Sequence, residues 1–455
     1  MEDDVIHNVM SKRGCHLGMV PELAAARNSS TLLTLDHDLG TSPEMGRRLT
    51  VAKLARHVAD LAGRLWSAGI RPGEHVAIHE TANFDVWVLA TAAARIGAVP
   101  VMLSPALTGP TISALLDRLD NPHLLTDAAK LDALADVGVA DRANRVIIVT
   151  GHRPDAVSLT ELAGAPPVAP VFRELEQPAL ITHTSGTTGL PKLVVHTART
   201  PRARLRPQLF LLALMRKRET VAIHVSFVHS RMFAAMTLCL SRAMPVLLVN
   251  DSDPEEVAGF FSRYSPGLIE ALPNSFLEWE GLASDPRKPF ASVKYFSSTF
   301  DAIHPRTIGR LLSSSERRAP MFFQIYGQSG VGPAVGRPYF RRIEDLVLSR
   351  LVELSELVVV PGPESEPVPV LCTNDDQPLD RNRWRAAVTE FPQLADPIQL
   401  PRAELPRTAT LKVQWIELSR RLHGRLGQRR DSRSLIQRRF TPNRGTSVPS
   451  SYCEW

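Results

Sequence analysis

Short apolar strand segments alternate with amphipathic helical segments along the first two thirds of this 455-residue chain. Residues 51–67 place apolar side chains at helical spacing behind Thr50, which is a favourable N-cap residue. The other segments of the alternation are the strands 76–79, 98–103, 146–149 and 245–249 and the helices 84–96, 112–119, 232–240 and 254–264. Because parallel strands are joined by helical crossovers, the pattern predicts parallel sheets covered by helices on both faces.

The chain is too long for a single hydrophobic core, so we expect more than one domain. We predict a large N-terminal α/β domain of doubly wound sheets over residues 1–340, incomplete at its C-terminal end. A small α+β domain is expected over 341–423, beginning with an amphipathic helix over 343–354 and a strand over 356–360. Apolar periodicity then stops, and 424–455 is predicted to be a flexible basic tail.

Charge and cysteine usage exclude several classes of protein. The net charge is +6, and many arginines lie in the tail without any nucleic-acid recognition motif, so we interpret them as a solvated surface. The four cysteines show no paired spacing, which argues against a disulfide framework. The acidic start has no apolar run behind it and no apolar stretch is long enough for membrane insertion, so we expect a cytoplasmic protein.

The most informative segment is residues 180–192, in which an apolar strand runs into a loop of hydroxyl residues and glycines that ends at Lys192. Glycines let the backbone approach a ligand closely, and successive N–H groups and hydroxyls can surround phosphate oxygens. The spacing differs from the Walker pattern, which needs Gly-Lys-Ser/Thr entering a helix. A flexible linker is the alternative, but the tight apolar strands on both sides favour a phosphate loop.

This loop resembles the phosphate loop of the adenylate-forming (AMP-dependent synthetase/ligase) superfamily, which includes acyl-CoA synthetases and luciferases. Segments 49–54, 69–77 and 97–105 resemble other conserved parts of that superfamily in the same order, and the resemblance covers roughly residues 20–423. It implies that the nucleotide is bound by the loop residues Thr184, Ser185, Gly186, Thr187, Thr188, Gly189 and Lys192.

Further site residues are implied by the same resemblance. His229 corresponds to a residue that lines the acyl pocket, although a packed structural histidine is an equally good reading. Tyr326 and Gly327 correspond to the adenine contact, and Ser329 to a hydroxyl at the α-phosphate. Gly330 replaces the glutamate that helps hold Mg²⁺ in relatives, so no protein ligand for the metal is assigned.

A C-terminal segment, residues 404–413, resembles the superfamily stretch that carries a catalytic lysine, here Lys412. By resemblance this lysine would reach the carboxylate and the α-phosphate during adenylation. Leu411 replaces the usual glycine beside it. On its own, Lys412 would be taken for a surface lysine.

Residues 338–342 pass almost directly into the predicted helix of the small domain. In relatives several dozen residues lie there, including a Thr-Gly-Asp whose aspartate binds ribose, and this chain has no Thr-Gly-Asp. We therefore infer an internal deletion. Unpaired strand edges or apolar patches are expected as a consequence.

The resemblance implies an ATP- and Mg²⁺-dependent ligase that activates a small-molecule carboxylic acid as an acyl-adenylate. The acyl group would then pass to a thiol, either coenzyme A or an acyl carrier protein. The apolar and aromatic segments 227–229, 295–300 and 324–326 favour an aryl or fatty acid. The alternative, based on Gly330 and the missing segment, is a catalytically impaired nucleotide- or acyl-binding remnant that acts through protein partners.

Overall fold

The computed structural model describes residues 10–11, 14–81, 83–184, 190–213, 217–301, 303–328, 332–340, 343–362, 366–389, 391, 394, 396–407, 413–414 and 417–422. The chain divides into two compact units, residues 1–341 and 342–455. The predicted tail over 424–455 lies outside the described residues.

The first unit contains an eight-stranded sheet with the order β17-β16-β15-β14-β12-β13-β3-β4. Its strands are β3 (Leu32–Leu35), β4 (Arg48–Thr50), β12 (Val221–His224), β13 (Val246–Leu248), β14 (Leu268–Ala271), β15 (Tyr295–Thr299), β16 (Met321–Gln328) and β17 (Gly332–Phe340). All neighbours pair in parallel except the two outermost strands, β4 and β17, which pair antiparallel.

A second sheet in the same unit has the order β11-β10-β6-β5-β7-β8-β9. Its strands are β5 (His75–His79), β6 (Val99–Met102), β7 (His123–Thr126), β8 (Arg145–Ile148), β9 (Val157–Ser158), β10 (Pro178–His183) and β11 (Leu193–Thr197). Only the β10–β11 pair is antiparallel, and the loop between these two strands is the predicted phosphate loop.

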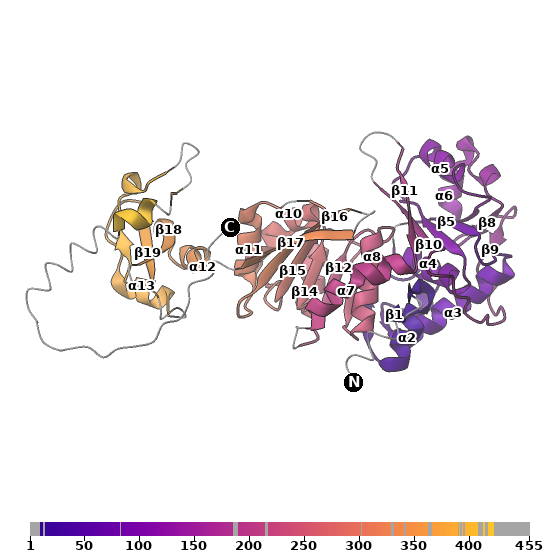
Figure 1. Cartoon of the computed structure of the whole chain (residues 1–455), viewed down its shortest axis with the longest axis horizontal. Helices are drawn as coiled ribbons and strands as arrows, with labels where there is room; N and C mark the ends of the chain where they lie inside the picture. Colours follow the sequence, from indigo (N-terminus) through magenta and orange to yellow (C-terminus); the bar gives the residue numbers. More distant parts are fainter. Residues whose placement is uncertain are drawn as a thin grey trace, which may run out of the picture. The chain divides into compact units, whose positions relative to one another are not determined.

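Helices cover both faces of both sheets, as predicted (Figure 1). One apolar cluster joins the two sheets through the helices α2 (Val20–Arg27), α3 (Val51–Ser67), α4 (Asp85–Arg95), α7 (Arg199–Ala213) and α8 (Ser230–Ser241). The outer face of the eight-stranded sheet packs on α9 (Pro254–Tyr264), α10 (Pro273–Glu278) and α11 (Pro305–Ser314). The outer face of the seven-stranded sheet packs on α5 (Gly109–Leu116) and α6 (Ala128–Ala133).

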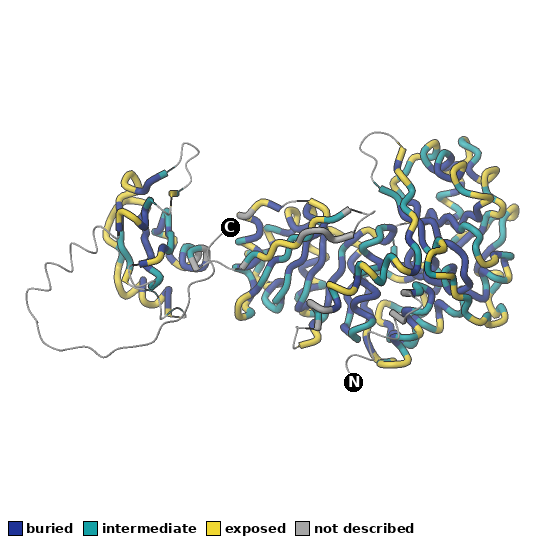
Figure 2. Tube along the Cα trace, viewed as in Figure 1, coloured by how far each residue is buried: buried dark blue, intermediate teal, exposed yellow. Residues whose placement is uncertain are grey.

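Figure 2 shows that the buried residues of this unit concentrate along the strands and on the helix faces turned toward them. The remaining short elements of this unit are the strands β1 (Met10–Ser11) and β2 (Gly14–Cys15) and the 3₁₀ helices Leu17–Met19, Pro43–Met45, Ala135–Val137, Ala140–Arg142 and Trp279–Ser284, and a further 3₁₀ helix, Arg402–Glu404, belongs to the second unit.

Local signals explain the helix boundaries that the sequence predicted. The Lys53 N–H donates to Thr50 Oγ1 at 3.2 Å, so Thr50 caps α3 as expected. Gly69 follows the helix with φ of +100°, a conformation that favours glycine. α9 has Pro254 at its first position, and Asp253 caps it by accepting from two backbone N–H groups.

The second unit contains a small mixed sheet, β18-β19-β20, together with helical segments, one of which spans residues 417–422. Its elements are α12 (Ile343–Arg350), β18 (Leu354–Pro361), β19 (Pro367–Thr373), α13 (Arg381–Ala387) and β20 (Ile398–Gln399). The α/β class with a large N-terminal and a smaller C-terminal part is therefore confirmed. The helix predicted over 343–354 is shorter than expected, because Leu354 already belongs to β18.

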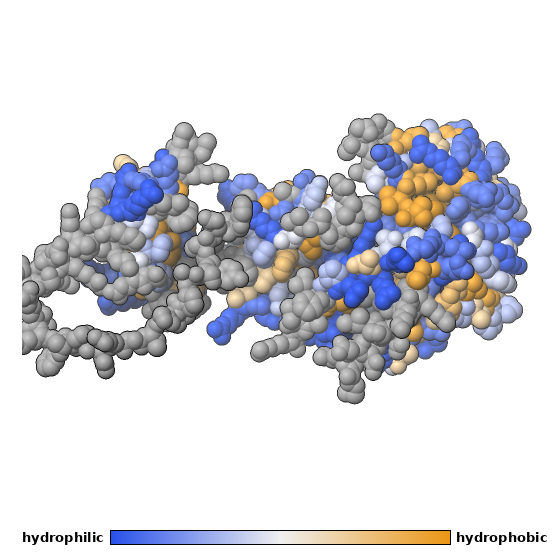
Figure 3. Space-filling view, viewed as in Figure 1, coloured by the Kyte–Doolittle hydropathy of each residue, from blue (hydrophilic) through white to orange (hydrophobic). Residues whose placement is uncertain are grey.

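Only two residues separate the end of β17 at Phe340 from the start of α12 at Ile343, so the junction is as short as the sequence suggested. Both β17 and β11 are the outermost strands of their sheets. Val195 of β11 is 51% exposed, and Figure 3 shows apolar residues gathered on the surface beside this strand. No helix in the described part of the chain combines the length and the hydropathy that crossing a bilayer requires.

Candidate functional site

The carboxyl edge of the eight-stranded sheet has the topology of a ligand-binding crevice. β12 lies between β13 and β14, and the chain leaves β12 through α8 on one face of the sheet but reaches β14 through α9 on the other. In open α/β sheets, ligands bind where successive connections leave toward opposite faces, outside the carboxyl ends of the strands. The described residues at the carboxyl ends of β12, β15 and β16 therefore define a candidate site without reference to any motif.

His229 lies at this edge, where it is partly buried and caps α8. Its Nδ1 accepts the backbone N–H of Arg231 at 3.0 Å. Its ring meets the ring of Phe300 edge-on, with centroids 4.5 Å apart. Phe300 directly follows β15 and has φ of +88°, a strained conformation for a non-glycine residue of the kind that clusters at functional sites.

Burial keeps the histidines of this region neutral. Desolvation, followed by the nearby His183 and Arg231, lowers the pKa of His229 to about 4. Desolvation also lowers the pKa of His183, and it lowers that of His196 to about 4. Because Nδ1 of His229 is an acceptor, the single proton of the neutral ring lies on Nε2. His229 can thus donate one hydrogen bond to a ligand without adding positive charge.

The predicted phosphate loop is closed at its base by two hydrogen bonds. The Thr184 N–H donates to the Lys192 carbonyl at 3.0 Å, and the Lys192 N–H donates to Thr184 Oγ1 at 3.4 Å. His183, the last residue of β10, accepts the Ser104 N–H at Nε2 (3.1 Å). The Lys192 side chain is exposed, and its ammonium has no partner among the described residues. A cation at the base of a hairpin loop suits a phosphate ligand.

Tyr326 and Gly327 lie inside β16, opposite Val335 and Pro333 of β17. The Tyr326 side chain is 56% exposed, although aromatic rings of this unit are otherwise mostly buried. An exposed ring beside a crevice offers a flat apolar surface for a base. The implied adenine contact is therefore sterically available.

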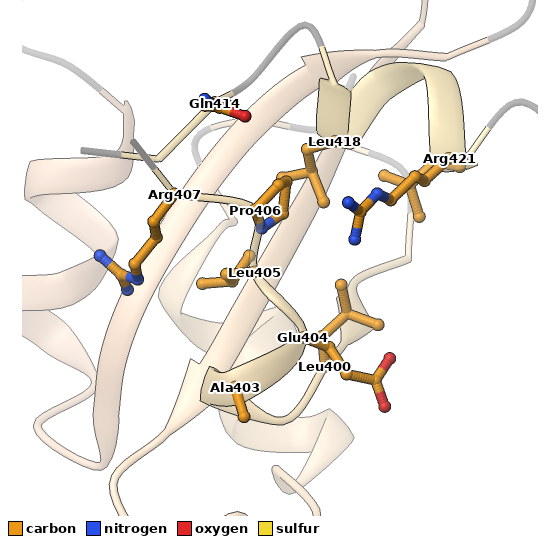
Figure 4. A pocket seen from close by; sticks show the side chains of 10 residues that line it. Leu400, Ala403, Glu404, Leu405, Pro406, Arg407, Gln414, Leu418 and Arg421 are labelled. Carbon is orange, nitrogen blue, oxygen red and sulfur yellow. The ribbon is translucent and has the colours of Figure 1, made fainter. Parts of the chain in front are cut away.

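The other predicted site residues lie outside the described residues: Ser185, Gly186, Thr187, Thr188, Gly189, Ser329, Gly330 and Lys412. Residues 396–407 and residues 413–414 are described on the two sides of the stretch that contains Lys412. Arg407 and Val413 form an antiparallel bridge, and the Gln414 N–H donates to the Pro406 carbonyl at 2.7 Å. A cavity of about 520 Å³ lies beside this bridge in the second unit, with Pro406, Leu405 and Leu418 in its wall (Figure 4).

The described residues do not supply a metal centre. They contain no group of three or more His, Cys, Asp or Glu side chains arranged to hold an ion. Mg²⁺ usually binds one or two carboxylates together with the phosphates of a nucleotide. Gly330 stands where the resemblance implies a metal-binding glutamate, so no residue of the crevice is assigned to the metal.

Sequence reasoning missed three features of this site. His183 and Phe300 were covered only as members of longer segments, and Arg231 was not considered. Arg231 forms an ion pair with Glu270 of β14, and the two side chains are 12% and 5% exposed. The only sequence signal for this ion pair was a single arginine in an otherwise apolar segment, because its partner Glu270 is remote in the sequence.

Comparison with known proteins identifies the same family that the loop at Lys192 resembles. The family model described as "AMP-binding enzyme" matches residues 24–370. The chain is 36% identical to 3-amino-2-hydroxy-4-methoxybenzoate diazotase from Streptomyces cremeus, covering 92% of this chain and 98% of that protein. It is 32% identical to a 4-chlorobenzoate–CoA ligase from an Arthrobacter species, over 35% of this chain and 30% of the ligase. A long-chain-fatty-acid–CoA ligase from Archaeoglobus fulgidus has the same fold, with a TM-score of 0.60 at 16% identity, covering 85% of this chain and 97% of that one.

The alignment with the diazotase also bears on the inferred deletion. It extends over 540 positions, more than the 455 residues of the whole chain. At least the difference between these lengths must be residues of the relative that have no counterpart here. An internal deletion of the kind inferred from the sequence is consistent with this alignment.

Proposed function

Because this chain belongs to the AMP-binding enzyme family, we propose that it uses ATP to activate an oxyacid as an adenylate and passes the activated group to an aromatic amine. The observation that carries the proposal is the likeness to a diazotase along nearly the full length of both proteins. Binding, alignment and neutralisation of phosphate charge are sufficient for adenylation, so no covalent nucleophile of the protein is required.

Diazotisation fits adenylating chemistry without an external oxidant or reductant. Conversion of an aryl amine into a diazonium group adds one nitrogen, and nitrous acid carries that nitrogen at the necessary oxidation level. A nitrite oxygen attacks the α-phosphorus of ATP, and pyrophosphate leaves. The amine nitrogen then attacks the nitrogen of the mixed anhydride, AMP leaves, and the amine nitrogen loses a proton to give a nitrosamine. The nitrosamine takes up a proton on its oxygen and loses water to give the diazonium ion.

The described residues take the following roles in this proposal. Thr184 and Lys192 hold phosphate oxygens, and Tyr326 with Gly327 contacts the adenine. The neutral His229 donates Nε2–H to the acid or to the amine in the crevice. From the family resemblance alone, Ser329 and Lys412 contact the α-phosphate region, and residues 185–189 complete the loop.

The test is an assay of pyrophosphate and AMP release with ATP, nitrite and a panel of aminobenzoates near neutral pH. Coupling of any diazonium product to a naphthol gives a coloured azo dye. The proposal predicts dye formation that requires ATP, nitrite and an amine together. Pyrophosphate release that does not depend on nitrite, or dye formation without ATP, would contradict it.

A second candidate is the acid–thiol ligase that the sequence implied, with coenzyme A or a carrier protein as acceptor. The likeness to the 4-chlorobenzoate–CoA ligase favours it, although that match covers a third of the chain. Replacing nitrite and amine by an aryl acid and coenzyme A in the same assay separates the two. The impaired-remnant alternative predicts no pyrophosphate release with any acid.

A further inference from the structure

An apolar groove lies between the helices α7 and α8 and one face of the eight-stranded sheet. Its volume is about 310 Å³, at the lower end of the range for ligand pockets and suited to a single-ring molecule. Leu238 of α8 and Phe323 and Ile325 of β16 contribute to its apolar lining. Arg231 and Glu270 add a charged pair to this otherwise mostly apolar wall.

This charged pair is not needed to fill the groove. A buried ion pair pays a large desolvation cost, and an apolar pair of the same size is often as stable or more stable. The Arg231–Glu270 pair has a polar neighbour in Gln208 of α7, whose side-chain oxygen accepts a hydrogen bond from Nη1 of Arg231. A charged pair retained in an apolar wall is therefore a candidate for recognising a polar substituent on a ligand.

The hydrogen-bonding capacity of the pair is only partly used. Arg231 donates from Nε and Nη2 to the two oxygens of Glu270, the latter at 2.7 Å, and from Nη1 to Gln208. A guanidinium has five N–H donors, so two N–H donors of Arg231 have no acceptor among the described residues. Each oxygen of Glu270 retains a free lone pair. The carboxylate can accept one more donor without breaking the ion pair.

We propose that Glu270, held by Arg231, is a specificity residue that accepts a hydrogen bond from the amino group of an aromatic amine bound in this groove. The inference rests on the proposed function, for which it names the group that recognises the amine. The backbone N–H of Arg231 also donates to His229, so the pair adjoins the candidate crevice. An amine bound at Glu270 lies beside the residues proposed to handle the activated acid.

The proposal is tested by calorimetric titration of the full chain with 3-aminobenzoate and with benzoate, in the absence of nucleotide. One hydrogen bond to a charged acceptor is worth about 1.5 kcal/mol, so the amine should bind about tenfold more tightly than benzoate. The double substitution Arg231→Met with Glu270→Leu removes both charges and leaves neither buried alone. It should reduce the preference to about one and leave benzoate binding unchanged.

A second variant keeps the test decisive if the double substitution does not fold. Leu238→Phe narrows the groove but leaves the ion pair in place, and it should weaken binding of both probes several-fold. Leu277→Ser, at an exposed position on α10 away from the groove, is the control and should change neither. A preference that survives the double substitution, or binding that is unaffected by Leu238→Phe, overturns the proposal.

Failure of this inference differs from failure of the proposed function. If the preference for the amine follows Glu270 but no ATP-dependent dye forms, the groove proposal stands and diazotisation is refuted. If dye forms but neither probe binding nor the preference responds to the groove variants, the amine binds elsewhere. Absence of measurable binding by either probe also overturns the groove assignment.

Discussion

Glu80 gives the clearest test of the electrostatics inferred for this fold. It follows β5 directly and is 1% exposed, and neither carboxylate oxygen has a hydrogen-bond partner among the described residues. Burial, and to a smaller extent the neighbouring Asp85 and Asp127, raises its pKa well above 4.5. Asp127 accepts from the Thr81 N–H at 2.7 Å, and Asp85 accepts from the Gly40 N–H at 2.6 Å.

The sign of the pH effect follows from linkage. In the folded chain Glu80 keeps its proton, whereas in the unfolded chain it loses the proton near its ordinary pKa. Between these two pKa values the unfolded state binds fewer protons, so the free energy of unfolding falls as pH rises. The slope is about 1.4 kcal/mol for each pH unit across that window. Below the pKa that Glu80 has in the unfolded chain, both states hold the proton and the free energy of unfolding does not depend on this group.

Glu80→Gln should abolish this slope, because glutamine is close in shape and carries no proton to lose. We expect the variant to gain about 1.4 kcal/mol over the natural chain for every pH unit above about 4.5, until the raised pKa is reached. Urea unfolding followed by tryptophan fluorescence at several pH values measures the difference. Trp87, fully buried in α4, gives the first unit a buried reporter.

The matched control is Glu278→Gln on the exposed surface of α10, which should not change the pH dependence. A difference between Glu80→Gln and the natural chain that stays constant with pH would show that Glu80 is ionised in the folded protein. The reasoning from burial would then be refuted. A buried water or cation bonded to the carboxylate would be the physical reason.

Three further predictions use the same measurements. Lys192→Ala should lower the rate of pyrophosphate release by about 10²-fold, because it removes a preorganised charge at the phosphates; an unchanged rate would contradict the loop assignment. Thr50→Ala should lower the free energy of unfolding by about 1 kcal/mol through loss of the α3 cap, measured in urea, and no change would mean that water replaces the cap. Gly267→Ala would place a Cβ 2.0 Å from Oε2 of Glu219 and disturb its ion pair with Arg317. It should destabilise by about 2 kcal/mol, and a neutral effect in urea would show that Glu219 can move.

The sequence predicted the elements whose signals are local. Helix α3 carries its own cap, its own stop and a regular apolar face, so its bounds were predicted correctly. The start of α9 was predicted from Pro254 in the same way. In contrast, α7 was missed because Pro207 and several arginines interrupt its pattern, and its helical state depends on burying Leu205 and Leu209.

Strands β16 and β17 show why the rest could not be predicted. No strand was predicted over residues 321–328, where the pattern carries a glycine at 327, yet these residues form β16. The strand forms because β16 pairs with β15 on one side and with β17 on the other. Such pairing depends on the whole sheet and cannot be read from the residues of β16 alone. The site follows the same rule: the loop at Lys192 was predicted from contiguous residues, whereas the Arg231–Glu270 pair joins residues 39 positions apart.

The position of the short junction determines which part of the chemistry it can affect. The proposed site residues all precede the junction between Phe340 and Ile343: Tyr326 lies in β16, and Lys192, His229 and Phe300 follow β10, β12 and β15 in the chain. A deletion at that point leaves these residues in the chain, but it places the small unit directly after the edge strand β17. Contacts supplied in relatives by the intervening residues must then be replaced or lost. Binding at the crevice and turnover can therefore fail separately, which makes ligand binding without nucleotide the more discriminating measurement for this chain.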